Sequence, residues 1–305
     1  MESLDAFAEQ VVDSINDVSG RHPGARASHA KGIVLEGTFT PSGAGLTRAA
    51  HMQEETVRVV ARVSNGGGDP HTPDGAREGR GLAVKFDLPD GTRTDVVTLS
   101  LPCFFVRTPE DFLELTRARR PDPATGRPDL ERVGAFLAAH PEALPAVQAA
   151  LGAEPPESYA TVTYHSIHSF RWIDAAGGSR FVRYRFEPEA GERTVPDERA
   201  RELGPDYLVD EIAARETPAA FRMLAVIAGE GDDVNDSTVA WPEDRERVEV
   251  GRLELTGLDH SRERDGDILV FDPLRLTDGI EPSDDPILHF RPRAYSVSVA
   301  RRTGG

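Results

Sequence analysis

Two short segments, far apart in the chain, carry residue types suited to proton transfer and to metal ligation. Near the start the sequence reads Arg26-Ala-Ser-His29-Ala-Lys-Gly32, and near the end it reads Arg291-Pro-Arg-Ala-Tyr295. The imidazole of His29 could accept and return a proton near neutral pH. Arg291 stands one turn before Tyr295 if that segment is helical, and its charge would then favour the ionised phenolate. Because a phenolate can ligate a metal ion, the two segments together suggest metal-assisted proton chemistry.

Composition narrows the classes of partner. The 305 residues carry a net charge of −17, which argues against binding to nucleic acid phosphates or to an anionic membrane surface. No apolar run approaches the roughly 20 residues of a membrane span, and the first ten residues carry acids where a signal peptide needs positive charge. Cys103 is the single cysteine, so no internal disulfide can form. We therefore expect a cytoplasmic protein without nucleic acid or membrane partners.

Apolar periodicity predicts the elements of the first half of the chain. A helix over 3–17 is indicated by helical spacing of Leu4, Phe7, Ala8, Val11, Val12 and Ile15. Strands are predicted at 30–40, 56–64, 80–88 and 93–99. The pair Asp90-Gly91 marks a hairpin between the last two. Helices are predicted at 109–118, 129–139 and 142–151.

The second half contains further strands and one interrupted helix. A hairpin is predicted from 159–173 and 179–187, and a helix over 196–216 should break at Gly204-Pro205. An apolar stretch covers 219–229, and strands are expected near 247–257 and 267–271. Because strands follow one another without helical crossovers, the sheet should be mainly antiparallel. We expect an α+β fold: one domain of residues 1–305, with a closed or nearly closed barrel over about 25–302 and helices at one end.

Several blocks, taken in order, resemble the haem catalases over roughly residues 20–302. After the segment around His29, they are Ala61-Arg-Val-Ser-Asn-Gly-Gly-Gly-Asp69, Arg80-Gly-Leu-Ala-Val-Lys-Phe86, Pro102-Cys-Phe-Phe-Val-Arg107, Pro109-Glu-Asp-Phe112, Phe271-Asp-Pro273 and Gly279-Ile-Glu-Pro-Ser283. The chain shows neither the long N-terminal arm nor the C-terminal helical domain of ordinary catalases. It looks like the small, catalase-related peroxidase branch of the family, on a catalase-like β-barrel.

The resemblance implies a haem b cofactor and a role for each matching residue. His29 corresponds to the distal acid/base, and Ser64 to the hydroxyl that orients its ring. Tyr295 corresponds to the proximal iron ligand, and Arg291 to the guanidinium that keeps it ionised. Haem propionates would be bound by Arg26, Arg62 and Arg302, and Phe112 would stack on the haem.

Two departures from the family pattern bear on activity. Leu99 stands where catalases carry a distal amide, and Ser28 stands where they usually carry valine before the distal histidine. An apolar distal side should favour organic hydroperoxides and an external organic reductant, so we expect a peroxidase with weak or no catalase activity. Three alternatives stay open. One is rearrangement of fatty-acid hydroperoxides, as in allene oxide synthase, because relatives with this activity carry a hydroxyl residue just before the distal histidine, as Ser28 does here. The others are true catalase activity and haem binding without turnover. By analogy we expect a homo-oligomer, a dimer or higher.

Overall fold

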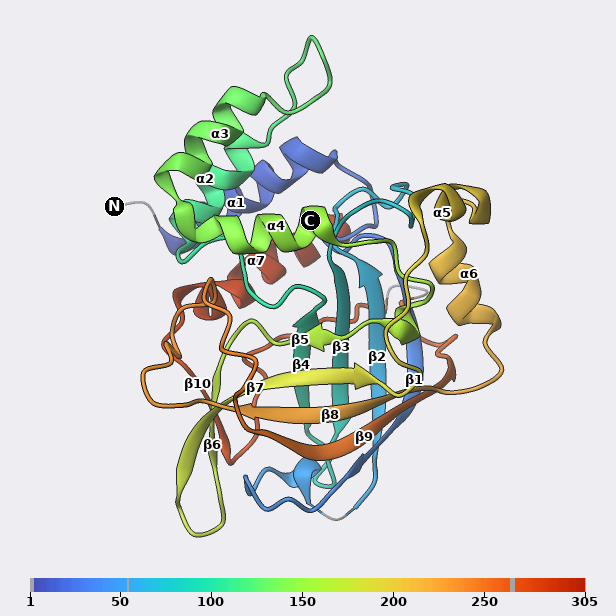
Figure 1. The fold of residues 1–305 in the computed structure, drawn as a ribbon, viewed down its shortest axis with the longest axis vertical. Coiled ribbons are helices and arrows are strands. Elements are labelled where there is room, and N and C mark those ends of the chain that lie inside the picture. The colour runs from blue at the N-terminus through green and yellow to red at the C-terminus, as the bar shows by residue number, and fades with distance from the viewer. Residues whose placement is uncertain (1–2, 54, 264–266, 305) are drawn as a thin grey trace.

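Most strands of the chain close into a β-barrel (Figure 1). The computed structural model describes residues 3–53, 55–263 and 267–304. Within these residues all pairs of strands are antiparallel, and the ring closes through pairing of β7 with β8. Around the ring, the strands are β1 (Gly32–Pro41), β2 (Val57–Asn65), β3 (Arg80–Asp87), β4 (Arg93–Leu99), β5 (Tyr164–His165), β7 (Ser179–Pro188), β8 (Ala219–Ile227) and β9 (Arg247–Leu258). The predicted antiparallel barrel is confirmed.

Two short strands extend the sheet beyond the ring. β6 (Phe170–Ile173) pairs with β7, and β10 (Ile280–Pro282) pairs with β6. The hairpin predicted around 174–178 is therefore confirmed as β6–β7. The hairpin at Asp90-Gly91 joins β3 to β4, where Gly91 adopts a φ of 82° that favours glycine.

Successive side chains of a strand point alternately into the barrel and out of it, so the inner and outer faces of the barrel carry different residues. On β2 and β3 the side chains of Val59, Ala61, Val63, Leu82 and Val84 point inward and join the main apolar core. The residues between them, such as Arg62 and Ser64, point outward. β2 is nonetheless buried along nearly its whole length, so the outer face of this wall is covered by other parts of the chain.

Helices gather mainly at one end of the barrel (Figure 1). They are α1 (Leu4–Ser19), α2 (Pro109–Ala118), α3 (Leu130–Ala139), α4 (Leu144–Gly152) and α7 (Pro286–Arg302). Each of α1, α2, α3 and α7 begins where a side chain accepts backbone N–H groups of its first turn, and these N-caps are Ser3, Thr108, Asp129 and Asp285. Beside the barrel lie α5 (Asp197–Leu203) and α6 (Tyr207–Ala214), separated at the predicted break.

Three short 3₁₀ turns complete the elements, at Ala50–Met52, Pro141–Ala143 and Tyr159–Thr161. In the described ranges, no helix combines the length and the apolar character that crossing a membrane requires.

Two predicted strands differ from the structure. The strand expected at 267–271 is wrong, because residues 267–271 form no strand. Their carbonyl groups bond to arginine side chains instead: Arg26 donates to Leu269 O at 2.8 Å and Arg275 to Val270 O at 3.0 Å. The apolar side chains of this segment cover the outer face of the barrel, in a cluster of Val34, Val60, Leu269 and Phe271.

The long strand expected over 159–173 is interrupted. Only β5 and β6 are strands there, and they are separated by a turn in which the Ser166 hydroxyl donates to His168 O at 2.7 Å. This side-chain bond competes with continuation of the ladder.

Candidate active site

A row of directly opposed residues crosses the outer face of β1 to β4. Gly32 pairs with Ser64, Ser64 with Gly81, and Gly81 with Leu99. Opposed residues of neighbouring strands point to the same face of a sheet. Ser64 and Leu99 therefore flank Gly81 on one surface. A Cβ at position 81 would lie only 2.8 Å from His29 Nδ1, so the absence of a side chain makes room for this imidazole.

The His29 ring is fixed by contacts from the end of β2. Its Nδ1 lies 3.0 Å from Ser64 Oγ, and its backbone N–H donates to Gly66 O at 3.2 Å. Its φ of 54° falls in the left-handed region, which costs energy for a residue with a side chain. The resulting strain is offset by these bonds. The predicted contact between His29 and Ser64 is present.

Electrostatics keep the imidazole neutral. Burial, as the largest cause, and then the charges of Arg62, Arg291 and Arg26 together lower the pKa of His29 to about 3. The His29 residue is half-buried in the structure. At neutral pH this ring is therefore unprotonated.

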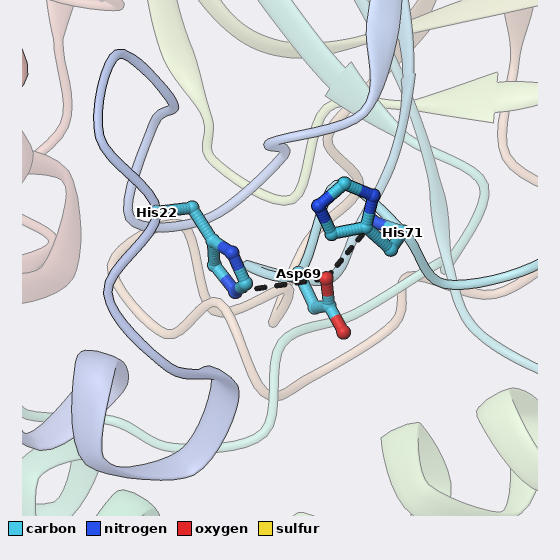
Figure 2. Close-up of side chains that lie close together, drawn as sticks. All are labelled: His22, Asp69 and His71. Atoms are coloured by element: carbon cyan, nitrogen blue, oxygen red, sulfur yellow. Dashed lines mark hydrogen bonds and ion pairs between the residues drawn. The ribbon is translucent and has the colours of Figure 1, made fainter.

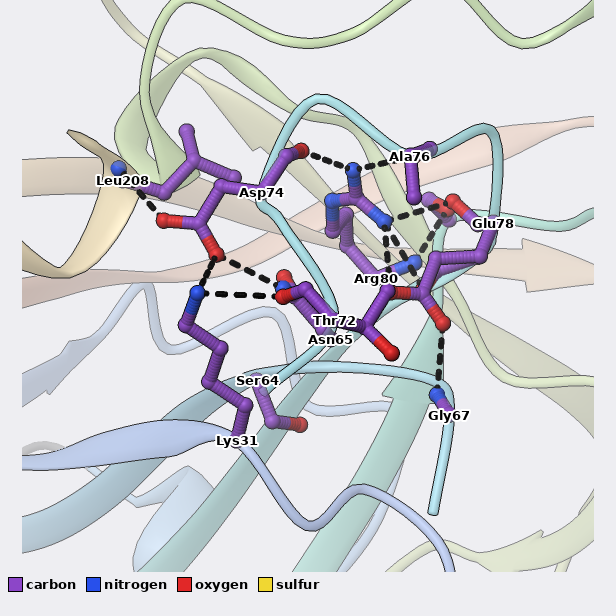
Figure 3. Close-up of polar contacts among 12 residues, drawn as sticks. Lys31, Ser64, Asn65, Gly67, Thr72, Asp74, Ala76, Glu78, Arg80 and Leu208 are labelled. Carbon is purple, nitrogen blue, oxygen red and sulfur yellow. Dashed lines mark hydrogen bonds and ion pairs between the residues drawn. The ribbon is translucent and has the colours of Figure 1, made fainter. Parts of the chain in front are cut away.

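A buried polar network behind Ser64 fixes the turn that follows β2 (Figure 3). Asp74 is fully buried; its Oδ1 accepts from Lys31 Nζ at 2.9 Å and from Asn65 Nδ2 at 2.8 Å. Arg80 donates to the Asp74 carbonyl at 2.7 Å. Breaking such a network leaves uncompensated buried charge, which is strongly destabilising. The network therefore holds Ser64 and the neighbouring backbone in one position.

On α7, several predicted residues share one side of the helix. Arg291, Tyr295, Ser298 and Arg302 are spaced three or four residues apart, which places them on one face. Arg291 Nε donates to Tyr295 Oη at 2.8 Å, and the guanidinium carbon lies 5.5 Å from the centre of the phenol ring. The helix continues through Pro292 in this region.

This face of α7 is directed toward the segment that carries His29. Ser298 Oγ accepts the N–H of Ala27 at 3.2 Å. The charge of Arg291 also contributes to the lowered pKa of His29. The N-terminal and C-terminal segments, far apart in sequence, therefore meet at one site.

The three arginines predicted to bind propionates meet at one carboxylate, that of Glu263. Arg26 contacts both of its oxygens, one at 3.0 Å, Arg302 Nη1 lies 3.4 Å away, and Arg62 Nε lies 3.6 Å away. Arg62 also donates to the carbonyl of His29 at 2.9 Å. Burial opposes ionisation of Glu263, but the hydrogen bond from Arg26 and the arginine charges hold its pKa below the usual value.

The cluster carries more positive than negative charge. Three guanidinium groups share one carboxylate, and burial followed by the charge of Arg26 lowers the pKa of Arg62 to about 9. Glu263 was not predictable from the sequence, because a lone glutamate in an irregular segment has no pattern that distinguishes it from a surface residue.

Leu99 and Phe112 complete the predicted set. Leu99 is half-buried at the end of β4, in the row beside Gly81. Phe112 lies on α2, stacked on Phe104 with ring centres 5.8 Å apart. It packs against an apolar cluster that includes Ile287 at the start of α7. The contacts described for Phe112 are with this apolar cluster. Its predicted stacking on the haem therefore rests on the family resemblance alone.

Comparison with known proteins decides the family. The family model described as catalase matches residues 9–305. The chain belongs to the catalase family. Among its relatives is a catalase-related peroxidase of Mycolicibacterium paratuberculosis, 45% identical over 97% of this chain and 95% of the relative. Another, of the same description, comes from Synechococcus elongatus, with 35% identity over 97% of this chain and 89% of the relative.

Longer family members match only in part. The catalase of Methanosarcina barkeri is 28% identical over 92% of this chain and 59% of its own length. A solved fungal catalase superposes with a TM-score of 0.81 at 24% identity, covering 93% of this chain and 60% of the fungal one. This likeness confirms the predicted catalase-like barrel.

Proposed function

We propose that this member of the catalase family is a haem peroxidase that reduces organic hydroperoxides and hydrogen peroxide with an external organic reductant. Both relatives named catalase-related peroxidase match nearly the whole chain, and membership of the family implies a haem cofactor. We propose haem b as the cofactor. The observation that carries the proposal is the contact between the α7 face and the His29 segment, through the bond from Ala27 to Ser298.

The residues at the site fit a haem. Arg291 Nη1 is buried without a hydrogen-bond partner among the described residues, beside the phenol of Tyr295. A guanidinium with donors to spare suits an anionic phenolate, which Tyr295 would offer as the iron ligand. The surplus charge of Arg26, Arg62 and Arg302 suits two propionates. The missing side chain at Gly81 makes room for the His29 ring.

Haem would supply the metal at which the O–O bond of the peroxide breaks and would store the oxidising equivalents for the reductant. His29 would take the proton from the peroxide oxygen nearest the metal and return it to the departing oxygen. The lowered pKa of His29 keeps the ring neutral before the reaction, which is the form that can accept a proton. Ser64, through its contact with Nδ1, would keep the ring plane and the tautomer constant.

Leu99 supports reduction by external donors over disproportionation of hydrogen peroxide. Its side chain lies beside Gly81 and hence next to His29, where an amide would hydrogen-bond a second peroxide. A leucine cannot donate, so a second peroxide is held less well. Its apolar surface also favours the alkyl part of organic hydroperoxides.

The proposal is tested by measuring oxygen release and dye oxidation on one enzyme sample. Dye oxidation should dominate, and fast, sustained oxygen release would contradict the proposal. A lipid hydroperoxide assayed with and without reductant separates reduction from rearrangement. Ser28, the hydroxyl residue on which the rearrangement alternative depended, is exposed in the structure, so reduction remains the proposed reaction.

Three further features belong to the same proposal. Residues 1–305 would form one domain, since the strands of the described residues all join one sheet. The protein would act in the cytoplasm, which fits its single cysteine. It would form a homo-oligomer, a dimer or higher, by analogy with catalase-like barrels.

A further inference from the structure

A second group of side chains with ligand chemistry lies outside the residues assigned to haem. His22, from the segment between α1 and β1, meets Asp69 and His71, from the turn between β2 and β3 (Figure 2). Each residue offers one ligand atom, and these atoms lie within 4.8 Å of one another. His22 and Asp69 are half-buried and His71 is exposed, so an ion could reach them from solvent.

Close backbone packing brings the two segments together. A Cβ at Gly68 would lie 2.1 Å from Ala27 O, so only glycine allows the turn to pack on the segment between α1 and β1. Gly20, with a φ of 85°, likewise leaves room for His22, whose Nε2 would be 3.1 Å from a Cβ there. The absence of side chains at these two glycines thus allows His22 and the turn that carries Asp69 to approach each other.

The side chains are already close to the arrangement of a bound ion. His22 Nε2 lies 3.6 Å from Asp69 Oδ1. Asp69 Oδ1 also accepts the backbone N–H of His71 at 2.9 Å, which holds His71 beside it, and the two imidazole rings are 5.8 Å apart, edge to face. Ligand atoms of a tetrahedral zinc ion lie about 3.4 Å from one another, given bonds of about 2.0–2.1 Å. A rotation of the exposed His71 side chain would close the remaining gap.

We propose that His22, Asp69 and His71 bind one Zn²⁺ ion, with water in the fourth position. Two imidazoles and a carboxylate form a donor set that suits zinc. His22 Nε2 now lies 2.8 Å from Ser19 O, to which it donates a hydrogen bond. The ion would take the place of this proton on Nε2. The net charge of −17 favours a cation over the whole molecule.

Zinc at this site would connect the segment leading to His29 with the turn leading out of β2. An ion bound only by the folded chain stabilises it in proportion to its concentration and affinity. A second group, Asp111, His140 and Glu142, also lies within ligand distance. It contains one imidazole and two carboxylates, a poorer set for zinc, and it provides the matched control.

The test uses untagged, haem-loaded protein freed of metal ions with a chelator. Isothermal titration with ZnCl₂ should show one ion bound per chain. His71→Ala and Asp69→Asn should each weaken the affinity at least about tenfold, the effect of losing roughly 1.4 kcal/mol of binding free energy. His140→Ala and His260→Ala, the latter at an exposed histidine, should bind as the wild type does. At one zinc concentration, the ion should raise the Tm of the wild type and of both controls more than that of His71→Ala.

Absence of zinc binding by the wild type would overturn the proposal. Wild-type affinity in His71→Ala would also overturn it, as would loss of binding in His140→Ala, which would place the ion at the second group. The Soret absorbance of each sample reports haem content separately. The zinc result therefore stands or falls independently of the proposed peroxidase function.

Discussion

Arg291 and Tyr295 are joined by a 2.8 Å hydrogen bond from the guanidinium Nε to the phenol oxygen, across one turn of α7. The spacing of four residues brings the two side chains together on one face of the helix. The same bond holds the phenol oxygen on the face of α7 that is directed toward the His29 segment. The relationship explains how the Tyr295 oxygen is held in one position before any metal is bound.

Removal of the distal imidazole should stop peroxide cleavage and spare haem binding. A positioned proton acceptor typically contributes 10²- to 10⁴-fold to a rate, so His29→Ala should slow reaction with peroxide by about that factor. His260→Ala, at an exposed histidine, is the control. Stopped-flow absorbance after mixing with peroxide measures the rate. A wild-type rate in His29→Ala would refute the assigned role.

The folding stability should rise with pH between about 4 and 6.5. Burial, as the largest cause, lowers the pKa of His51 to about 3 and those of His165 and His168 to about 4. These rings are neutral in the folded chain but bind a proton near pH 6.5 when unfolded. The unfolded state thus holds more protons across this window, so the free energy of unfolding falls as pH decreases, by at most about 1.4 kcal/mol per unit for each ring.

His51 provides the variant for this prediction. It is fully buried beside Phe86, and neither ring nitrogen has a hydrogen-bond partner in the described part of the chain. His51→Phe should flatten the dependence of Tm on pH below 6.5, whereas His260→Phe should not. An unchanged slope in His51→Phe would show that folding does not lower the pKa of this ring.

Restoring an amide at the end of β4 should shift activity toward oxygen release. Leu99→Asn places a hydrogen-bond donor beside Gly81, on the face of the sheet against which the His29 ring packs. One net hydrogen bond changes a rate by roughly two- to tenfold, so the ratio of oxygen release to dye oxidation should rise by about that factor. Val97→Asn, two residues before Leu99 on β4 and on the same face of the sheet, controls for the added polarity. An equal rise in both variants would remove the special role of position 99.

Glu263 should compete with haem for the arginine cluster. Its carboxylate is bound by Arg26, Arg62 and Arg302, the residues proposed for the propionates. Glu263→Gln removes the charge and should let the apoprotein bind hemin faster and more tightly, as measured by the Soret absorbance during titration. Glu216→Gln, at an exposed glutamate, is the control. Weaker hemin binding in Glu263→Gln would mean that this carboxylate organises the arginines for haem.

The strands and helices with clear periodicity were predictable, and β1 to β4 differ from expectation by at most two residues at either end. The predicted strand at 267–271 failed because its carbonyls accept from Arg26 and Arg275, which no local pattern reveals. Whether such a segment forms a strand depends on hydrogen bonds from side chains to its backbone, and these side chains can be distant in sequence.

The site was predictable only in part. Residue types and order identified His29, Tyr295 and their partners through the family resemblance. The convergence of three arginines on Glu263 and the close approach of His29 to Gly81 depend on strand register and on contacts between distant segments. Register follows from the whole barrel, so a single segment does not encode it.

The absorption spectrum of the purified, haem-loaded protein tests most directly whether Tyr295 is the iron ligand. The wild type should show high-spin ferric haem with the charge-transfer bands of tyrosinate ligation. Tyr295→Phe should lose these bands, and Arg291→Met should shift them. Arg293→Met, whose arginine bonds to Asp5 instead, should leave them unchanged. The same bands in Tyr295→Phe, or a wild-type protein that takes up no hemin, would contradict the account.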